Sequence, residues 1–323
     1  MLAAYAVAAD PEHPLEALRV GEIEPPPVPA DWVPVQVRAA ALNHHDVWSL
    51  RGVGLPADRL PMILGCDAAG VTDDGREVVV HAVVNDPAYT GADDTYDPRR
   101  SLLSERYPGT LAETVRVPAR NLVDKPAGLS FVEAACLPTA WLTAYRALFT
   151  AGALHPGDTV LVQGAGGGVA TAAIMLGRAT GLRVWVTSRD PQRADRAEAL
   201  GAHRGFGAGE RLPEKVDAVL DSVGAATWSH SVNALRPGGR LVTVGTTSGA
   251  DLRNAELTRI FFRPLQVIGS TMGTRAELAA VVQLVEHAGL HPLIDRVIGL
   301  TEAASGLAAM AAGDVFGKIV LEP

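Results

Sequence analysis

The sequence predicts an α/β protein of two domains, in which a β-rich part precedes an open parallel sheet with helices on both faces. Three observations predict it. The 323 residues suffice for two ordinary domains. Residues 1–124 contain short β-type runs separated by Pro, Gly and Asp clusters. From about Ser130 onward, short apolar strands alternate with helices, which is the pattern of a buried parallel sheet.

Composition excludes several classes of protein. Apolar residues make up 48% and charged residues 20%, which is typical of globular chains and not of disordered or fibrous ones. The net charge is −8 and no long basic run occurs, so we expect no nucleic-acid partner. The two cysteines, Cys66 and Cys136, cannot build a disulfide framework or a four-thiolate metal cluster.

The chain also lacks signals for export or membrane insertion. Its start, MLAAYAVAADPEHP, has no basic n-region, so it is not a signal peptide. The most membrane-like stretch, residues 134–154, is interrupted by Pro138 and Arg146 before it reaches spanning length. We therefore expect a soluble, cytoplasmic protein with no membrane partner.

The first domain is predicted from three β-type runs, WVPVQVRAAAL, REVVVHAVV and LAETVRVPA. Residues 85–105 are polar, acidic and poor in apolar side chains, so we expect a surface loop or lobe there. The tail contains a helix near residues 301–312 and a final strand in GKIVLEP. It is too short to form its own domain, and we expect it to return to the first one.

The second domain opens with a helix whose start is marked by a capping box, Ser130 with Glu133, and which contains Trp141 and Tyr145. A second helix start is marked by Asp190 and Pro191, since Asp caps a helix and Pro fits its first position. Another helix begins at Gly168. The predicted strands are TVLVQ, LRVWVTS, VDAVLD, RLVTVG and LQVIGS.

A glycine-rich turn follows the TVLVQ strand and predicts a dinucleotide site. Glycines let the backbone approach a pyrophosphate, whose charge is favoured at a helix N-terminus. The strict G-x-G-x-x-G pattern is absent, but Gly164, Gly167 and Ala170 keep small residues at the turn, approach and packing positions. The candidate phosphate-binding residues are Gly164, Gly166, Gly167, Gly168 and Val169.

The end of the next strand indicates which dinucleotide binds. An NAD site places Asp or Glu here for the ribose diol, whereas a cation suits a 2′-phosphate. This chain has Ser188 and Arg189, with Arg193 one turn on, and Asp190 is occupied as a helix cap. The pattern favours NADPH over NADH. At the ends of later strands, the residues expected to border the nicotinamide ribose are Val223, Gly224, Gly245 and Thr246.

Several motifs together resemble the medium-chain dehydrogenase/reductase superfamily, in particular its zinc-free quinone oxidoreductase-like branch. They are NHHD at 43–46, GCDAAGV at 65–71, GTLAE at 109–113, ACLPT at 135–139, the glycine turn, and GKIV at 317–320. The resemblance implies a GroES-like catalytic domain at residues 1–124 and 272–323, and a Rossmann domain at 125–271. It also implies an active site in the cleft between them and a homodimer formed through the strand near 265–270.

The sequence departs from its zinc-dependent relatives at the positions that bind their catalytic metal. The positions that match their catalytic Cys, His and Cys hold Asn43, Cys66 and Thr139, and three protein ligands are needed for catalytic zinc. We expect no metal, although His44 or His45 could in principle substitute. Without a Lewis acid, oxidising an alcohol is hard, whereas reducing a conjugated carbonyl needs only hydrogen-bond donors for the developing charge.

The resemblance assigns roles to individual side chains. His44 matches a residue that reaches the cofactor pyrophosphate, and Thr139 is a further cofactor-binding candidate. His45 matches a member of the proton relay and is our proton-donor candidate, although solvent supplies the proton in some quinone reductases of this branch. Asn43 and Asp46 complete the catalytic candidates. Those for the substrate pocket are Trp48, Cys66 and Trp141.

The function expected from the sequence is NADPH-dependent, zinc-independent reduction of a quinone or other α,β-unsaturated carbonyl. Two alternatives remain open. One is an alcohol dehydrogenase that holds zinc with unconventional ligands, and the other is an NADPH-binding protein without turnover.

Overall fold

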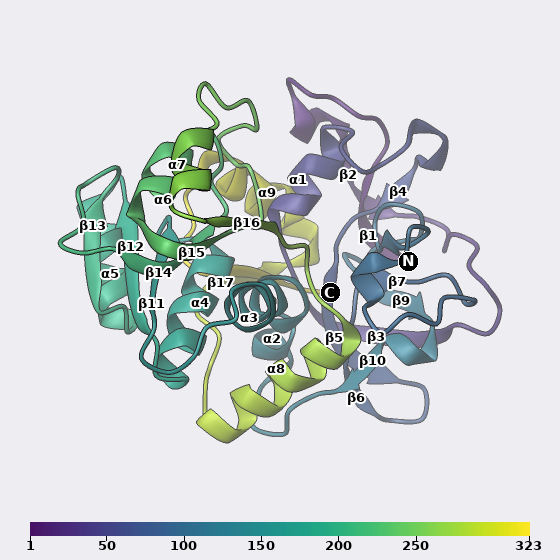
Figure 1. Cartoon of the computed structure of the whole chain (residues 1–323). Helices are drawn as coiled ribbons and strands as arrows, with labels where there is room; N and C mark the ends of the chain where they lie inside the picture. Colours follow the sequence, from purple (N-terminus) through teal and green to yellow (C-terminus); the bar gives the residue numbers. More distant parts are fainter. The chain divides into compact units, whose positions relative to one another are not determined.

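The computed structural model describes residues 1–323 and divides into two compact units. The first unit comprises Met1–Ala140 and Gly273–Pro323, and the second comprises Trp141–Met272 (Figure 1). The first boundary lies later than the expected residue 125. The reason is that helix α2 (Phe131–Ala134) packs against strands β3 (Val33–Ala41) and β5 (Asp67–Thr72) of the first unit. None of the helices is long and apolar enough to cross a membrane.

The first unit is built around β3, in which the buried Val35 and Val37 alternate with the exposed Gln36 and Arg38. This strand pairs antiparallel with β5, β9 and β18 in a seven-stranded sheet of order β10-β6-β5-β3-β18-β17, with β9 also on β3. The partners are β6 (Glu77–Val80), β9 (Thr114–Val117), β10 (Leu122–Asp124), β17 (Ile294–Gly299) and β18 (Lys318–Glu322).

The remaining elements of the first unit surround this sheet. A three-stranded sheet consists of β1 (Leu2–Ala6), β2 (Leu18–Glu22) and β4 (Met62–Ile63), and a two-stranded one of β7 (Val83–Val84) and β8 (Ser101–Leu102). The helices are α1 (His44–Leu50), α2, α8 (Arg275–Ala288) and α9 (Ala303–Ala312). Short 3₁₀ turns lie at Pro14–Ala17, Ala57–Arg59, Asp94–Tyr96, Ala119–Asn121 and Leu300–Glu302.

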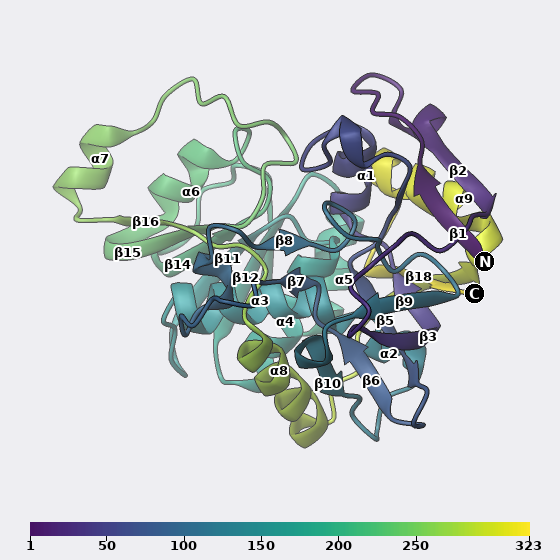
Figure 2. The same cartoon turned by 90° about the vertical axis from the view of Figure 1, so that its right-hand side faces the viewer.

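The tail returns to the first unit, as predicted. Strand β18 pairs with β3 at Val320–Ala41 and Leu321–Ala40, and α9 packs against α1 and β2. Figure 2 shows α9 and β18, in yellow, beside these purple and blue elements. The final strand is therefore an interior strand of the main sheet.

The prediction of a surface loop at residues 85–105 is wrong for its last part. Strand β8 pairs with β7, and Leu103 and Ser104 are fully buried. The acidic residues that suggested a loop lie earlier, where Asp93 and Asp97 accept backbone N–H bonds in tight turns. Strand β8, which follows these turns, is too short to show an alternating pattern of buried and exposed residues in the sequence.

The second unit is a six-stranded parallel sheet of order β13-β12-β11-β14-β15-β16, as expected for a Rossmann domain. The strands are β11 (Thr159–Gln163), β12 (Arg183–Ser188), β13 (Arg204–Gly207), β14 (Val216–Asp221), β15 (Leu235–Thr243) and β16 (Gln266–Gly269). The helices are α3 (Leu142–Tyr145), α4 (Gly168–Ala179), α5 (Pro191–Leu200), α6 (Trp228–Ala234) and α7 (Leu257–Phe262), with a π-helical turn at Arg146–Ala151. A further π-helical turn, Leu137–Trp141, lies at the boundary between the units.

The order of these strands places a ligand-binding edge. Strand β11 lies between β12 and β14, so the strand order reverses beside it. In open parallel sheets, ligands bind outside the carboxyl ends of the strands at this reversal. The glycine turn directly follows β11 and stands at that point.

Candidate active site

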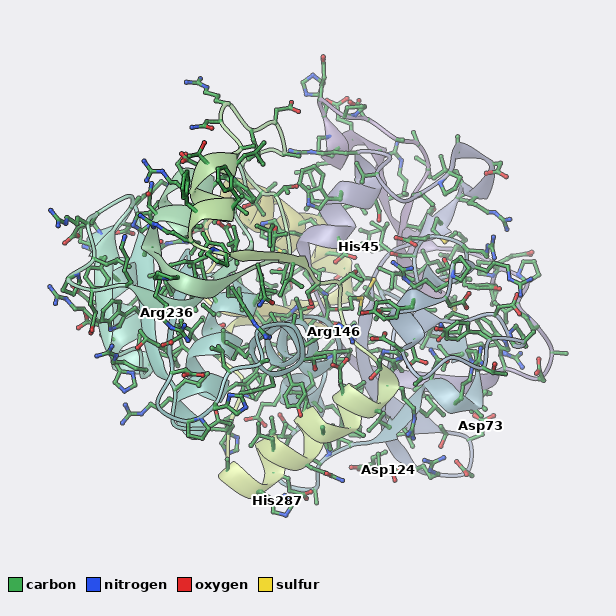
Figure 3. The ribbon with its side chains drawn as sticks, in the orientation of Figure 1. His45, Asp73, Asp124, Arg146, Arg236 and His287 are labelled. Carbon is green, nitrogen blue, oxygen red and sulfur yellow. The ribbon has the colours of Figure 1, made fainter.

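His45 is held at the start of helix α1, directly after the central strand β3 (labelled in Figure 3). The helix begins with a capping interaction in which the backbone N–H of Asn43 donates to Asp46 Oδ2 at 2.8 Å. The cap fixes the first turn, and with it the direction of the imidazole. Asp46, predicted as a catalytic residue, is fully buried and accepts this bond, so it also stabilises the start of α1.

Both ring nitrogens of His45 have partners within the first unit. Nε2 lies 3.1 Å from Glu105 Oε1, while Nδ1 lies 3.4 Å from Cys66 Sγ and 3.4 Å from Ser104 Oγ. The Cys66 thiol donates to the carbonyl of Leu103 at 3.3 Å, which turns its lone pairs toward the ring. The arrangement is an imidazole between a carboxylate and a thiol.

The surroundings of His45 favour its charged form. Burial lowers the pKa of the imidazole, but Cys66, Glu105 and Asp46 outweigh burial and hold this pKa well above its usual value. Burial raises the pKa of the Cys66 thiol, although His45 opposes it. The arrangement therefore favours an imidazolium beside a neutral thiol. An imidazolium has a proton to donate to a developing oxyanion.

A second buried group, Lys318, lies next to these residues. Its Nζ donates to Asp67 Oδ2 at 3.0 Å, to Asn43 Oδ1 at 2.6 Å and to the carbonyl of Leu42 at 2.7 Å. Lys318 is 4% exposed and Asp67 is 0% exposed, so this is a buried ion pair. Burial, the largest influence, raises the pKa of nearby Asp46 to about 6.

The residues at the three zinc-ligand positions do not fit zinc. Asn43 uses its amide oxygen for Lys318 and its amide nitrogen for the carbonyl of Ala41. Thr139 offers only a hydroxyl, and Cys66 is directed at His45 and Leu103. No group of three or more His, Cys, Asp or Glu side chains is arranged to hold a metal ion. His44 and His45 do not provide a zinc site in place of these residues, since both ring nitrogens of His45 already have other partners: Glu105 at Nε2, and Cys66 and Ser104 at Nδ1.

The candidates for contact with substrate or cofactor differ in how exposed their side chains are. Trp48 is half-buried, with the Arg51 guanidinium 5.1 Å from its ring centre. His44 is exposed and free to reach a ligand. Trp141 is only 1% exposed, so its ring has no free face and the prediction that it stacks on an acceptor is not supported. The helix around it is apolar on all sides, which buries the ring. Cys66 is likewise 1% exposed.

In the second unit, the glycine turn has the backbone that the motif predicted. Gly164 has φ +84°, a left-handed conformation that favours glycine. Gly167 is the N-cap of α4 and contributes no capping side chain, and a Cβ placed on it would meet no neighbour. The first N–H groups of α4 therefore remain for an anion, and the turn fits the pyrophosphate of a dinucleotide.

The specificity residues lie where β12 ends. Ser188 is the last residue of β12, and Arg189 is exposed beyond it. Asp190 caps α5 by accepting the Gln192 N–H at 2.9 Å, as predicted. Arg193 lies with its Nε 3.9 Å from Asp190 Oδ2. Arg189 thus stands free at the position where the sequence predicts contact with a 2′-phosphate.

A buried polar network, which we did not predict, ties three strand ends together. Gln163 at the end of β11 accepts from Thr187 Oγ1 of β12 at 2.6 Å and donates to Ser231 Oγ at 3.0 Å. Ser231 in turn donates to Asp221 Oδ2 of β14 at 2.7 Å. The Gly164 N–H donates to Thr187 Oγ1 at 3.3 Å, so the network also holds the glycine turn.

The other strand-end candidates follow the same edge. Asp221 Oδ1 accepts the N–H groups of Val223 at 2.8 Å and Gly224 at 3.0 Å. Gly224 has φ +90°, and the space at Gly245 is limited by the carbonyl of Ser222. Thr246 follows Gly245 and is exposed. These residues border the carboxyl ends of β14 and β15.

The candidates thus form two sets. Asn43, His45, Asp46 and Cys66 lie together in the first unit, whereas the dinucleotide candidates from 164 to 246 lie in the second. Three residues were missed as members of the first set: Ser104, Glu105 and Lys318. Lys318 stands in the terminal GKIV motif, which gave a signal, but Glu105 and Ser104 carry none in the sequence.

Comparisons with known proteins agree with this fold. The family described as "Alcohol dehydrogenase GroES-like domain" matches residues 29–127, and "Zinc-binding dehydrogenase" matches residues 168–287. A solved structure of an NAD-dependent alcohol dehydrogenase superposes with a TM-score of 0.91 at 34% identity and covers 100% of both chains. The chain belongs to the medium-chain dehydrogenase/reductase superfamily.

The members of the superfamily that resemble the chain are named for different activities. An acryloyl-coenzyme A reductase of Sulfurisphaera tokodaii is 25% identical, over 96% of this chain and 98% of its own length. A crotonyl-CoA carboxylase/reductase in complex with NADP shares the fold with a TM-score of 0.88, at 24% identity over 99% of this chain and 94% of that one. This medium-chain dehydrogenase/reductase is therefore an oxidoreductase.

Proposed function

We propose that the protein is an NADPH-dependent, zinc-independent reductase that transfers hydride to a quinone or other α,β-unsaturated carbonyl. One observation carries the proposal: His45 is held between Glu105 and Cys66 in a place where the zinc-ligand positions do not fit zinc. A protonated imidazole suits an acceptor whose oxygen gains charge. An alcohol substrate would need a base and a Lewis acid instead.

In this mechanism, bound NADPH supplies a hydride to the conjugated carbon of the acceptor. His45 donates the proton on Nε2 to the resulting enolate or quinol oxygen, because Nδ1 is enclosed by the buried Cys66 and Ser104, and the Glu105 carboxylate orients the ring through the same Nε2. The capping bond between Asn43 and Asp46 keeps the first turn of α1 in place. The glycine turn and the first N–H groups of α4 hold the pyrophosphate.

Two comparisons support parts of the proposal. The acryloyl-coenzyme A reductase is named for a conjugated acyl thioester, so such thioesters belong among the acceptors to test. The carboxylase/reductase complex contains NADP, in agreement with a free Arg189 at the 2′-phosphate position. The alcohol dehydrogenase of similar structure is named NAD-dependent, so NADH must be tested in parallel.

The deciding experiment measures NADPH consumption by metal-stripped protein with an ortho-quinone, a simple enone and an acyl thioester of the same enoyl group, with NADH as control. A further sample oxidises a primary alcohol with NADP⁺ before and after zinc is added. Turnover of a conjugated acceptor without metal supports the proposal. Zinc-dependent alcohol oxidation contradicts it, and binding of NADPH without any turnover favours a non-catalytic role.

Replacing Arg189 by aspartate is expected to reverse cofactor preference. The carboxylate repels a 2′-phosphate and can accept from the ribose diol of NADH. The NADPH to NADH ratio of kcat/KM should fall by about 10- to 100-fold, since a charge-assisted hydrogen bond contributes about 1.5–3 kcal/mol. Arg178→Asp makes the same charge change in the last turn of α4 and should leave the ratio unchanged. An unchanged ratio in Arg189→Asp contradicts the assignment.

We also propose a homodimer formed through β16 near residues 265–270. Strand β16 is the last strand of its sheet, and an unpaired edge can pair with a second copy. Exposed apolar side chains accompany it, with Phe261 65%, Phe262 73% and Val267 43% exposed. Their exposure in one chain is consistent with burial between two copies.

Replacing Val267 by lysine is expected to yield monomers, because it places a charge in the paired edge. Light scattering coupled to size-exclusion chromatography measures the mass. Val297→Lys is a matched control: Val297 is also 43% exposed and also lies on the last strand of a sheet, β17. A dimer that persists in Val267→Lys, or that is lost only in Val297→Lys, contradicts the proposed interface.

A further inference from the structure

Glu105 connects His45 to a solvent-filled surface hollow. Its Oε1 lies 3.1 Å from His45 Nε2, and its Oε2 accepts the Leu102 N–H at 3.1 Å. The carboxylate is therefore held at both oxygens, with its side chain 24% exposed. Neither the sequence motifs nor the proposed hydride transfer assigns it a step of its own.

The hollow has a volume of about 220 Å³ and is lined by Glu105, Asp58, Arg59, Arg100 and Arg106, among others. Asp58 and the three arginines are exposed, so water reaches it. A water molecule takes about 30 Å³ of liquid volume, so the hollow holds several. No ion pair engages the three guanidinium groups, and they give the hollow a local positive charge in a protein whose net charge is −8.

The proposed reduction consumes one proton from solvent in each turnover, because hydride adds to the acceptor as an anion. If His45 donates that proton, its imidazole must be reprotonated before the next turnover. The groups at Nδ1 offer no access to water, since Cys66 is 1% and Ser104 0% exposed. Asp46, the other acidic group that acts on His45, is 0% exposed. The His45 side chain is itself 21% exposed, and of its neighbours only Glu105 borders both the ring and the hollow.

We propose that Glu105 supplies protons to His45, by taking a proton from hydronium or a buffer acid in the solvent of the hollow and passing it to Nε2, which leaves water or the conjugate base of the buffer behind. The inference rests on the proposed function. In each cycle the carboxylate becomes a carboxylic acid, and its O–H bond breaks as the N–H bond to neutral His45 forms. The imidazolium and the carboxylate are restored, one proton has moved, and no electrons are transferred. Glu105 is a positioning and relay residue, since it acts on the acceptor only through His45.

The test compares Glu105→Gln with Asp58→Asn. Both remove one carboxylate from the same hollow, but Asp58 makes no hydrogen bond to His45. Enzyme equilibrated near pH 6, where His45 is protonated, is mixed with NADPH and an enone. Glu105→Gln should slow the turnovers that follow the first equivalent of NADPH by about 10²- to 10⁴-fold, the range that general acid–base catalysis contributes, and should slow the first turnover far less. Asp58→Asn should show wild-type kinetics in both phases.

Two further readouts separate proton supply from a structural role. Removing Glu105 removes one of the groups that raise the pKa of His45, so the alkaline decline of kcat/KM should move to lower pH. In Glu105→Ala, formate should restore the slow phase, since the arginines attract the anion and formic acid can carry the proton. Equal slowing of both phases, with no rescue, overturns the proposal.

A measurement that needs no turnover tests the proton path independently of the proposed function. NMR of ¹⁵N-histidine-labelled protein follows the solvent exchange of the His45 Nε2–H, which should slow in Glu105→Gln and not in Asp58→Asn. If the wild type reduces no acceptor but this difference is seen, the proposed function fails and the proton path stands. If exchange is the same in all three proteins, the proton path is wrong whatever the activity.

Discussion

Replacing His45 by alanine is expected to lower kcat by about 10²- to 10⁴-fold, the range that general acid catalysis contributes. The imidazole lies between Glu105 and Cys66, and the other charged donor nearby, Lys318, is buried and already donates to Leu42, Asn43 and Asp67. The Kd for NADPH should stay nearly unchanged, because the candidates for binding its pyrophosphate are His44 and the glycine turn, not His45. Stopped-flow hydride transfer and fluorescence titration with NADPH measure the two quantities.

His44→Ala provides the contrast for this result. His44 is the adjacent residue, is exposed, and is expected to reach the pyrophosphate, so its loss should raise the KM for NADPH and leave kcat within a few-fold. A normal kcat in His45→Ala removes His45 from the mechanism and leaves solvent as the proton donor. That outcome would also remove the need for Glu105 as a relay.

The largest effect on stability is expected from Lys318→Met. The substitution keeps the unbranched stem of the side chain as far as Cε but leaves the Asp67 carboxylate fully buried without its partner at 3.0 Å. Removing one member of a buried pair destabilises proteins by about 3–5 kcal/mol, because the remaining charge is uncompensated. The free energy of unfolding, from urea denaturation at pH 7, measures the loss.

The double variant Lys318→Met with Asp67→Asn tests whether charge is the cause. Neutralising both partners should recover much of the lost stability, whereas a packing defect would persist. The pair of Arg76 with Asp124 is the matched surface control, with side chains 51% and 81% exposed. Arg76→Met should change the free energy of unfolding by less than about 1 kcal/mol. Equal losses at both sites would contradict the assigned role of burial.

Local patterns allowed much of the fold to be predicted. Asp190 and Pro191 mark the start of α5, and the glycine turn follows β11, because caps and tight turns depend on neighbouring residues. Strand β13 was not predicted. Of its four residues, Arg204–Gly207, two are glycines and only Phe206 is buried, so no alternating pattern exists.

The candidate site was predictable only in part, for a related reason. Asn43, His45 and Asp46 share one helix turn, and their spacing is visible in the sequence. Glu105 reaches His45 across 60 residues, and Lys318 reaches Asp67 across 251. Contacts of this range arise from the packing of the whole sheet, which composition and spacing along the chain do not describe.

The position of β18 bears on how the protein is made on the ribosome. The strand occupies the interior of the main sheet, between β3 and β17, yet it is formed by Lys318–Glu322 at the end of the sequence. Residues 141–272 can fold as soon as they emerge. Until residues 318–322 are made, β3 lacks its neighbouring strand β18 and Asp67 lacks the ammonium group of Lys318. The unit that is translated first is thus completed only after the second unit, and a nascent chain in which residues 318–322 are not yet made exposes an open sheet edge to chaperones and proteases.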